Sequence, residues 1–332
     1  MKAFELENLH KRYGKVVALR GLTVEAPTGA IGLLGPNGAG KTTMIRALLG
    51  LITFEEGQGR VLGRDIRRER LAIREIVGFA PEDECLFPGL QGVEFVCYAG
   101  ELCGMPRKDA LRRAHEMLDY VGLGEARYRP VEGYSTGMKQ RLKIASALVH
   151  DPKLLILDEP TNGMDPEGRR EILELARDLS RNKGMSLLFS SHLLPDVEAV
   201  CDHVLVMGGG RLLLSGSIAE LTRRERIRYV VKVKSHVAEY RRALEALGAT
   251  TETREDQGRD EFLAEPPAGR DVEIFWETAR GTGIQVRRLQ RERTTLEQVF
   301  LQAVADAGSP NANEAKTAEV ETEFAAESVG AV

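Results

Sequence analysis

The stretch Gly35-Pro36-Asn37-Gly38-Ala39-Gly40-Lys41-Thr42-Thr43 decides how the rest of the chain is organised. It fits the pattern G-x-x-x-x-G-K-[ST], whose glycines let the backbone curl until several N–H groups point at phosphate oxygens. An apolar run at 30–34 precedes it as a predicted buried strand, and residues 44–49 follow as a predicted helix. That helix adds unpaired N–H groups and the positive end of its dipole. The stretch therefore predicts a strand–loop–helix unit that binds a nucleoside triphosphate.

All nine residues of this phosphate loop are expected to line the nucleotide, and two of them have a predicted chemical role. Lys41 places a positive charge near the β- and γ-phosphates, and the hydroxyl of Thr42 is placed to ligate Mg²⁺. A glycine-rich turn that matches by accident is the competing interpretation. The strand before the loop and the helix after it count against that interpretation.

The composition is typical of a globular protein and gives no indication of nucleic-acid binding. The 332 residues carry 46 basic and 50 acidic side chains, which is not the positive balance that binding to a phosphate backbone favours. No apolar stretch approaches the roughly 18 residues of a membrane-spanning helix, and the N-terminus lacks the hydrophobic segment of a signal peptide. The four cysteines show no metal-ligand spacing, so we expect reduced thiols in a cytosolic chain.

The order of segments predicts two domains and a tail. Strand-like and helical segments alternate over residues 1–224, which predicts an α/β fold with a largely parallel sheet. Within it we interpret residues 10–15 as a turn and residues 86–134 as a helical subdomain. Residues 225–307 predict a small α+β domain of the split βαβ kind, with Trp276 in its core. Residues 308–332 are rich in Ala, Glu, Ser and Thr and are expected to be disordered.

A second apolar strand, at 154–157, ends in two carboxylates, Asp158 and Glu159. The carboxyl ends of buried parallel strands meet at one sheet edge, so Asp158 is expected beside the phosphate loop, where it can hold Mg²⁺ through water. Glu159 is then next to the γ-phosphate and suited to orient or deprotonate an attacking water. An Asp-Glu pair is common at strand ends, and the phosphate loop is what makes this one specific.

Two further stretches narrow the class of nucleotide-binding protein. Tyr134-Ser135-Thr136-Gly137-Met138-Lys139-Gln140-Arg141 precedes an apolar helix at 142–149, and Ser190-Ser191-His192 ends a strand. The first resembles the signature of ATP-binding-cassette (ABC) ATPases, whose usual form is Leu-Ser-Gly-Gly-Gln, and His192 looks like the switch histidine of that family. Tyr13 stands where family members place an aromatic ring against adenine. The resemblance covers about residues 4–221, nearly the whole first domain.

The resemblance implies an ATPase that works as a homodimer. Two nucleotide-binding domains close head to tail around two ATP molecules, and each site joins the phosphate loop of one chain to Ser135 and Gly137 of the other. It also implies a separate polytopic membrane permease subunit, whose coupling helix docks on the helical subdomain at 86–134. The chain is then expected at the cytoplasmic face of the cell membrane, as a peripheral subunit with no nucleic-acid partner.

The chain departs from the commonest family pattern at two places. Pro81-Glu82 stands where the family usually has a glutamine, so Glu82 would bring a charge to Mg²⁺ or water. Thr136 and Met138 replace a glycine and a glutamine of the signature. At both places the sequence resembles the ATPase subunits of ABC-2-type exporters, so the resemblance favours that subgroup. The two departures leave the rate of hydrolysis open.

The sequence favours the transporter subunit over two alternatives. A soluble ABC ATPase that acts on ribosomes or DNA is disfavoured, because the chain carries one cassette, no heptad run and no excess of positive charge. An inactive regulatory subunit is disfavoured by the intact Lys41, Asp158, Glu159 and His192.

Overall fold

The computed structural model describes residues 2–222, 228–253, 260–292 and 296–300. These residues form two compact units, one that takes in the chain up to Ala219 and one of Glu220–Val299. Each unit has its own hydrophobic core. None of the helices in the described ranges has the length and apolarity that crossing a membrane requires.

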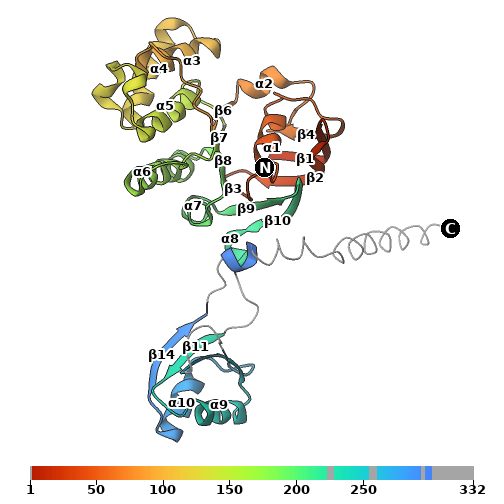
Figure 1. Cartoon of the computed structure of the whole chain (residues 1–332), viewed down its shortest axis with the longest axis vertical. Coiled ribbons are helices and arrows are strands. Elements are labelled where there is room, and N and C mark those ends of the chain that lie inside the picture. The colour runs from red at the N-terminus through yellow and green to blue at the C-terminus, as the bar shows by residue number, and fades with distance from the viewer. Residues whose placement is uncertain (1, 223–227, 254–259, 293–295, 301–332) are drawn as a thin grey trace, which may run out of the picture. The chain divides into compact units, whose positions relative to one another are not determined.

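The centre of the first unit is a sheet whose strand order is β10-β9-β3-β8-β7-β6 (Figure 1). Its strands are β3 (Ala30–Leu34), β6 (Val77–Ala80), β7 (Leu154–Asp158), β8 (Ser186–Ser191), β9 (His203–Gly208) and β10 (Arg211–Ser217). Neighbouring strands run parallel from β9 to β6, and β10 pairs antiparallel with β9. Every residue of β3, β7 and β8 is buried, as expected of parallel strands covered on both faces. The predicted α/β fold with a largely parallel sheet is confirmed.

The register of this sheet brings several strand ends to one edge. Leu34 at the end of β3 pairs with Ser191 of β8, and Asp158 at the end of β7 pairs with Ser190. The segments that leave β3, β6, β7 and β8 therefore emerge side by side. These segments begin with Gly35, Pro81, Glu159 and His192 respectively.

Helices cover the central sheet and lie close to its strands. Along the chain, α1 (Lys41–Leu48) follows β3, and α7 (Leu194–Val200) follows β8. The segment that connects β7 to β8 contains α6 (Pro166–Arg177) and a π-helical turn (Asp178–Asn182). α7 packs against β3 and β8. Its approach requires a glycine at position 32, because a Cβ atom there would lie 2.3 Å from Cγ1 of Val197.

A group of helices follows β6 along the chain. It contains α3 (Gly92–Leu102), α4 (Arg107–Tyr120), two 3₁₀ turns (Gly124–Tyr128 and Val131–Gly133) and α5 (Thr136–Leu148). α5 packs against α3 and α4 on one side and reaches β6, β7 and α6 on the other. We expected this helix to begin at 142, but it begins at Thr136, so the Ser-Thr-Gly segment forms its start and its first turn.

An antiparallel sheet completes the first unit, with strand order β2-β1-β4-β5. Its strands are β1 (Lys2–Tyr13), β2 (Val16–Pro27), β4 (Glu56–Val61) and β5 (Arg64–Asp65), and the short helix α2 (Arg70–Arg74) follows them. Phe4, Leu6 and Leu9 of β1 share a core with Ile45 and Leu48 of α1. The predicted turn at 10–15 is wrong in extent: β1 continues to Tyr13, because His10 and Lys11 pair with Arg20 and Leu19 of β2.

The second unit contains a four-stranded antiparallel sheet and the helices α9 and α10, and it is preceded by the short helix α8 (Ile218–Leu221). Its elements are β11 (Tyr229–Val233), α9 (Val237–Ala246), β12 (Thr250–Thr253), β13 (Glu261–Glu265), α10 (Glu273–Thr282) and β14 (Val286–Arg291), and the strand order is β12-β13-β11-β14. Residues 296–300 are also helical. The β-α-β-β-α-β order is that of the split βαβ kind, with β12 as a strand that the sequence pattern did not reveal. Tyr240, Phe262 and Phe275 form its core, whereas Trp276 is 47% exposed and was wrongly expected there. The tail at 308–332 lies outside the described residues.

Candidate functional site

The phosphate loop connects the end of β3 to the start of α1. Gly40 precedes α1 with a left-handed backbone (φ 100°), a conformation that glycine adopts at little cost. Gly35 packs so tightly that a Cβ atom there would lie 2.5 Å from the carbonyl oxygen of Met207. Thr42 and Thr43 stand in the first turn of α1, where N–H groups have no partner inside the helix. The loop thus has the backbone geometry of an anion-binding cradle.

Lys41 is buried at the centre of this loop. Its side chain is 7% exposed, and its Nζ donates a hydrogen bond of 2.7 Å to the carbonyl oxygen of Gly35. The same Nζ lies 3.1 Å from Oε1 of Glu159. An ammonium in such a buried position needs a negative partner, and in this structure Glu159 provides it.

Glu159 and His192 form the second half of this cluster. Nδ1 of His192 lies 2.8 Å from Oε2 of Glu159, and the backbone N–H of His192 donates to the same oxygen at 3.3 Å. Glu159 has a left-handed backbone (φ 48°), which is uncommon for a residue with a side chain and is found most often at functional sites. The carboxylate of Glu159 therefore joins the loop after β3 to the loop after β8.

Asp158 lies at the end of β7 and faces the start of α1. The hydroxyl of Thr42 donates a hydrogen bond of 3.1 Å to Oδ2 of Asp158. Burial is the main cause that raises the pKa of Asp158, and the carboxylates of Glu82 and Glu159 add to it, while the hydroxyls of Ser190 and Thr42 act in the opposite direction. Its Oδ1 is buried and makes no hydrogen bond within the described part of the chain.

This pair of side chains suits Mg²⁺. A hydroxyl and a carboxylate with a free oxygen are hard oxygen ligands, which that ion prefers, and it usually keeps several waters as further ligands. A cation there would also compensate the buried charge of Asp158. Thr42 and Asp158 are therefore suited to hold Mg²⁺.

Glu82 follows β6 and approaches the same edge. Its Oε1 accepts a hydrogen bond of 2.9 Å from Nδ2 of Asn162, three residues after Glu159. The carboxylate of Glu82 is one of the causes that raise the pKa of Asp158. The segment after β6 thus places a third carboxylate near Asp158 and Glu159.

Tyr13, Ser135 and Gly137 lie outside this cluster. Tyr13 ends β1 with its ring 45% exposed, and Nζ of Lys11 lies 4.9 Å from the ring centroid. Ser135 caps α5 by accepting a hydrogen bond of 3.3 Å from the N–H of Met138. In the described ranges no hydrogen bond or ion pair joins Ser135 or Gly137 to Lys41, Asp158, Glu159 or His192.

Two buried charged groups near the site were not among the residues predicted from the sequence. Asp196 of α7 is fully buried and accepts hydrogen bonds from Thr161 (2.6 Å) and from Nε of Arg169 (2.7 Å). Lys143 of α5 is also buried. The position of Lys143 inside the mostly apolar run 142–149 could have indicated this group, because a buried charge requires partners.

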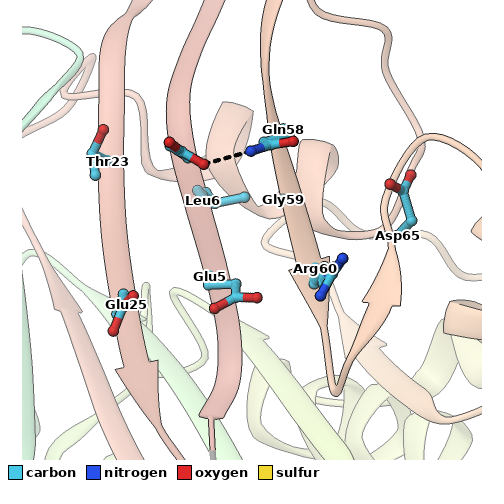
Figure 2. Close-up of a pocket in the computed structure, with 9 residues that line it drawn as sticks. Glu5, Leu6, Thr23, Glu25, Gln58, Gly59, Arg60 and Asp65 are labelled. Atoms are coloured by element: carbon cyan, nitrogen blue, oxygen red, sulfur yellow. Dashed lines mark hydrogen bonds between the residues drawn. The ribbon is translucent and has the colours of Figure 1, made fainter.

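A concavity of about 470 Å³ lies on the antiparallel sheet, and none of its lining residues belongs to the cluster described above. Figure 2 shows that its side chains come from neighbouring strands of this sheet. The lining residues include Glu5, Glu7 and Glu25, but Lys2 already pairs with Glu5 and Glu25, and Gln58 donates to Glu7. We therefore assign no site to it.

A phosphate loop after a central parallel strand, with a carboxylate pair at the end of a nearby strand, defines a P-loop nucleoside triphosphatase. The model of the ABC transporter family matches residues 19–162. The ABC transporter ATP-binding protein YxlF of Bacillus subtilis is 35% identical over 301 residues, which are 90% of this chain and 98% of that protein. This chain belongs to the ABC transporter ATP-binding proteins and is an ATP-hydrolysing enzyme of that class.

Further relatives place the chain within this family. The daunorubicin/doxorubicin resistance ATP-binding protein DrrA of Streptomyces peucetius is 33% identical over 306 residues, covering 90% of this chain and 92% of DrrA. Among solved structures, cbiO1 from Clostridium perfringens, part of the ABC transporter complex cbiONQ, matches with a TM-score of 0.60 at 30% identity. That match covers 66% of this chain and 90% of cbiO1. The chain is thus an ABC ATP-binding subunit that is similar to a drug-resistance ATP-binding protein.

Proposed function

We propose that this chain is the ATP-hydrolysing subunit of an ABC-2-type exporter. The observation that carries the proposal is the cluster at one sheet edge, where Lys41 contacts Glu159, Glu159 contacts His192, and Thr42 contacts Asp158. The resistance function named for DrrA supports export as the direction. Selectivity for the transported substrate lies in the membrane subunit, so the proposal names no substrate.

Each residue of the cluster has a role in the proposed reaction. The phosphate loop with Lys41 binds the phosphates of ATP, and Tyr13 stacks on its adenine. Thr42 and Asp158 hold Mg²⁺, with Glu82 nearby, and the ion neutralises phosphate charge when bound. Glu159 accepts a proton from the attacking water. His192 orients the carboxylate of Glu159 and contacts the γ-phosphate.

The proposal includes a homodimer, because the signature lies outside the cluster of its own chain. Two copies close head to tail, so that Ser135 and Gly137 of one copy face the γ-phosphate held by the other. The N-terminus of α5 suits this contact, since unpaired N–H groups and the helix dipole attract an anion. Closure around ATP and its release after hydrolysis then drive the transport cycle.

The proposed membrane partner is a separate polytopic permease subunit, which holds this chain at the cytoplasmic face of the membrane. Phe87 and Tyr98 are 52% and 44% exposed. The ring centroid of Phe87 lies 6.0 Å from that of Phe95 and 6.0 Å from that of Tyr98. Beside them a groove of about 290 Å³ is lined by Glu84, Leu86, Phe87, Pro88, Val131, Glu132 and Lys139. A coupling helix of the permease fits such a groove, since exposed aromatic clusters mark interaction sites.

One experiment tests both the chemistry and the partner. The full chain carrying Glu159→Gln is tagged and recovered with ATP from detergent-solubilised membranes of its native cell. We expect a stoichiometric polytopic membrane protein in the eluate, and an ATPase rate about 10²-fold or more below that of the unaltered chain. Adding Phe87→Asp is expected to remove the membrane protein, whereas Leu71→Asp, on an exposed position of α2, is not. Recovery with ribosomes, nucleic acid or nothing would contradict the transporter role, and near-normal turnover would contradict the role of Glu159.

A further inference from the structure

Lys143 holds a loop in place from inside the protein. It lies on α5, is 6% exposed, and its Nζ donates to the carbonyl oxygens of Pro81 (2.7 Å), Glu82 (3.1 Å) and Asp83 (3.3 Å). A protonated lysine has three donors and no acceptor, so these three carbonyls use its whole donor capacity. The loop that they belong to, between β6 and α3, has no helix or strand of its own in residues 81–90.

The surroundings of Lys143 offset the cost of burying its charge. Burial lowers the pKa of Lys143, and this is the largest influence on it, while Cys85, Asp83, Glu84 and Glu82 act to raise it. One turn earlier on the same helix, Lys139 forms an ion pair with Glu84. Two lysines of α5 therefore bind consecutive residues of one acidic loop, the first at the surface and the second inside.

The loop at residues 81–90 carries Glu82, whose side chain approaches Asp158 and Glu159. Glu82 accepts the hydrogen bond from Asn162, and the backbone N–H of Asn162 donates to the carbonyl oxygen of Glu159 at 3.2 Å. The carboxylate of Glu82 also acts on the charge of Asp158. A shift of the backbone at position 82 would therefore change the distance between Glu82 and both acids. Through Lys143 this backbone is joined to α5, the helix that Ser135 caps.

We propose that Lys143 is a positioning residue for the ATPase reaction, whose ammonium fixes the backbone of residues 81–83 to α5 and so holds Glu82 beside Asp158 and Asn162. The inference rests on the proposed function in one respect, the approach of Glu82 to Mg²⁺ or its waters. It adds a physical link within one chain: the loop of one nucleotide site and the signature helix that serves the other site move as one body.

The test uses the full chain with Lys143→Met, Glu82→Gln and both changes together. In the chain without nucleotide, Lys143→Met is expected to speed hydrogen exchange at the amides of 82–90, because the loop loses the three hydrogen bonds that attach it to α5. In ATPase assays it is expected to raise the Mg²⁺ concentration for half-maximal rate several-fold and to lower kcat on the order of 10-fold, since small misplacements at a site cost rate. With Lys143 gone, Glu82→Gln should add little, because residues of one network are not additive.

Three comparisons keep the inference falsifiable. Lys108→Met removes a lysine from an exposed position of α4 and is expected to change neither exchange nor Mg²⁺ demand, and Lys143→Arg is expected to restore most of both. If Lys143→Met does not fold, Lys143→Gln takes its place in the cycle, because its neutral amide removes the charge and one of the three donors. Unchanged exchange, a lower melting temperature with unchanged Mg²⁺ demand, or additive effects of the two changes would overturn the role of Lys143. A separate result, Glu82→Gln with unaltered Mg²⁺ demand, would instead refute the proposed role of Glu82.

Discussion

At the scale of single residues, other protein groups compensate the buried charges of the cluster only in part. Lys41 is paired with Glu159, but Asp158 keeps a buried oxygen without a hydrogen-bond partner in the described residues, and its pKa is raised, mainly by burial. A raised pKa means that the folded protein disfavours the charged form of Asp158. The buried carboxylate of Asp158 thus lowers the stability of the fold, and its Oδ1 can coordinate a cation.

This imbalance predicts that Asp158→Asn stabilises the chain without nucleotide or Mg²⁺. The fold disfavours a charged Asp158 at any pH above its raised pKa, so removing the charge should raise the melting temperature there by about 2–4 °C. As the pH falls through the raised pKa, the native carboxyl binds a proton, and the advantage of the variant should disappear. Calorimetry of both chains between pH 4 and pH 8 measures this. Adding Mg²⁺ and ATP should reverse the order, since only the carboxylate binds the ion well; a variant less stable than the parent in their absence would contradict this account.

At the scale of the element, the start of α5 serves two purposes that can be separated. Ser135 caps the helix through the N–H of Met138, and an N-cap contributes about 1 kcal/mol to stability. In the proposed dimer the same residue faces the γ-phosphate of the partner copy. An aspartate caps a helix as well as a serine does, but its charge repels phosphate.

We therefore expect different outcomes for two changes at this position. Ser135→Ala should lower the melting temperature by about 2–4 °C through the lost cap, while Ser135→Asp should leave it near that of the parent. ATP-dependent dimerisation should suffer more from Ser135→Asp than from Ser135→Ala. Calorimetry and sedimentation in the Glu159→Gln background measure the two effects. If dimerisation followed thermal stability across the pair, the phosphate role of Ser135 would be refuted.

The elements of the first unit were largely predictable, because their signals are local. Apolar runs marked β3, β7 and β8, and the residues with predicted chemistry directly follow those runs, so the parallel sheet brings them together. The extent of β1 was misjudged because its polar residues lie at the surface, where pairing with β2 and not burial sets the strand. Trp276 was misjudged because an aromatic residue in a helix can face either way.

The contacts of Lys143 and the backbone of Glu159 could not be predicted from local patterns. Lys143 reaches Pro81 across 62 positions of the chain, and only the path of the loop after β6 makes that contact. The left-handed φ of Glu159 follows from the surrounding structure and contradicts the ordinary preference of glutamate. The signature was recognised through resemblance, and its helix start at Thr136 required the structure.

At the scale of the whole molecule, the two units are candidates for separate tasks. The first contains the cluster, and the second has a core of its own around Tyr240, Phe262 and Phe275. Of the described residues with a proposed role in ATP hydrolysis, none belongs to the second unit. We propose that this unit supports dimerisation.

A chain shortened to residues 1–224 tests that proposal. It should bind ATP with the affinity of the full chain, because every residue assigned to one chain's phosphate site is kept. Its dimer should be weaker, since the second unit no longer contributes to assembly. Analytical sedimentation with ATP, again with Glu159→Gln, measures both chains under the same conditions. Sedimentation equal to that of the full chain would show that the second unit does not hold the dimer together.

The separation of Ser135 from the Lys41 cluster within one chain has a genetic consequence. If each composite site takes its phosphate loop from one copy and its signature from the other, two different defects in two chains need not damage both sites. A Lys41→Ala chain and a Ser135→Asp chain would each be inactive alone. Expressed together, they would form mixed dimers with both defects in one site and none in the other. Such cells should regain part of the export that neither allele supports by itself, an instance of complementation within a single gene.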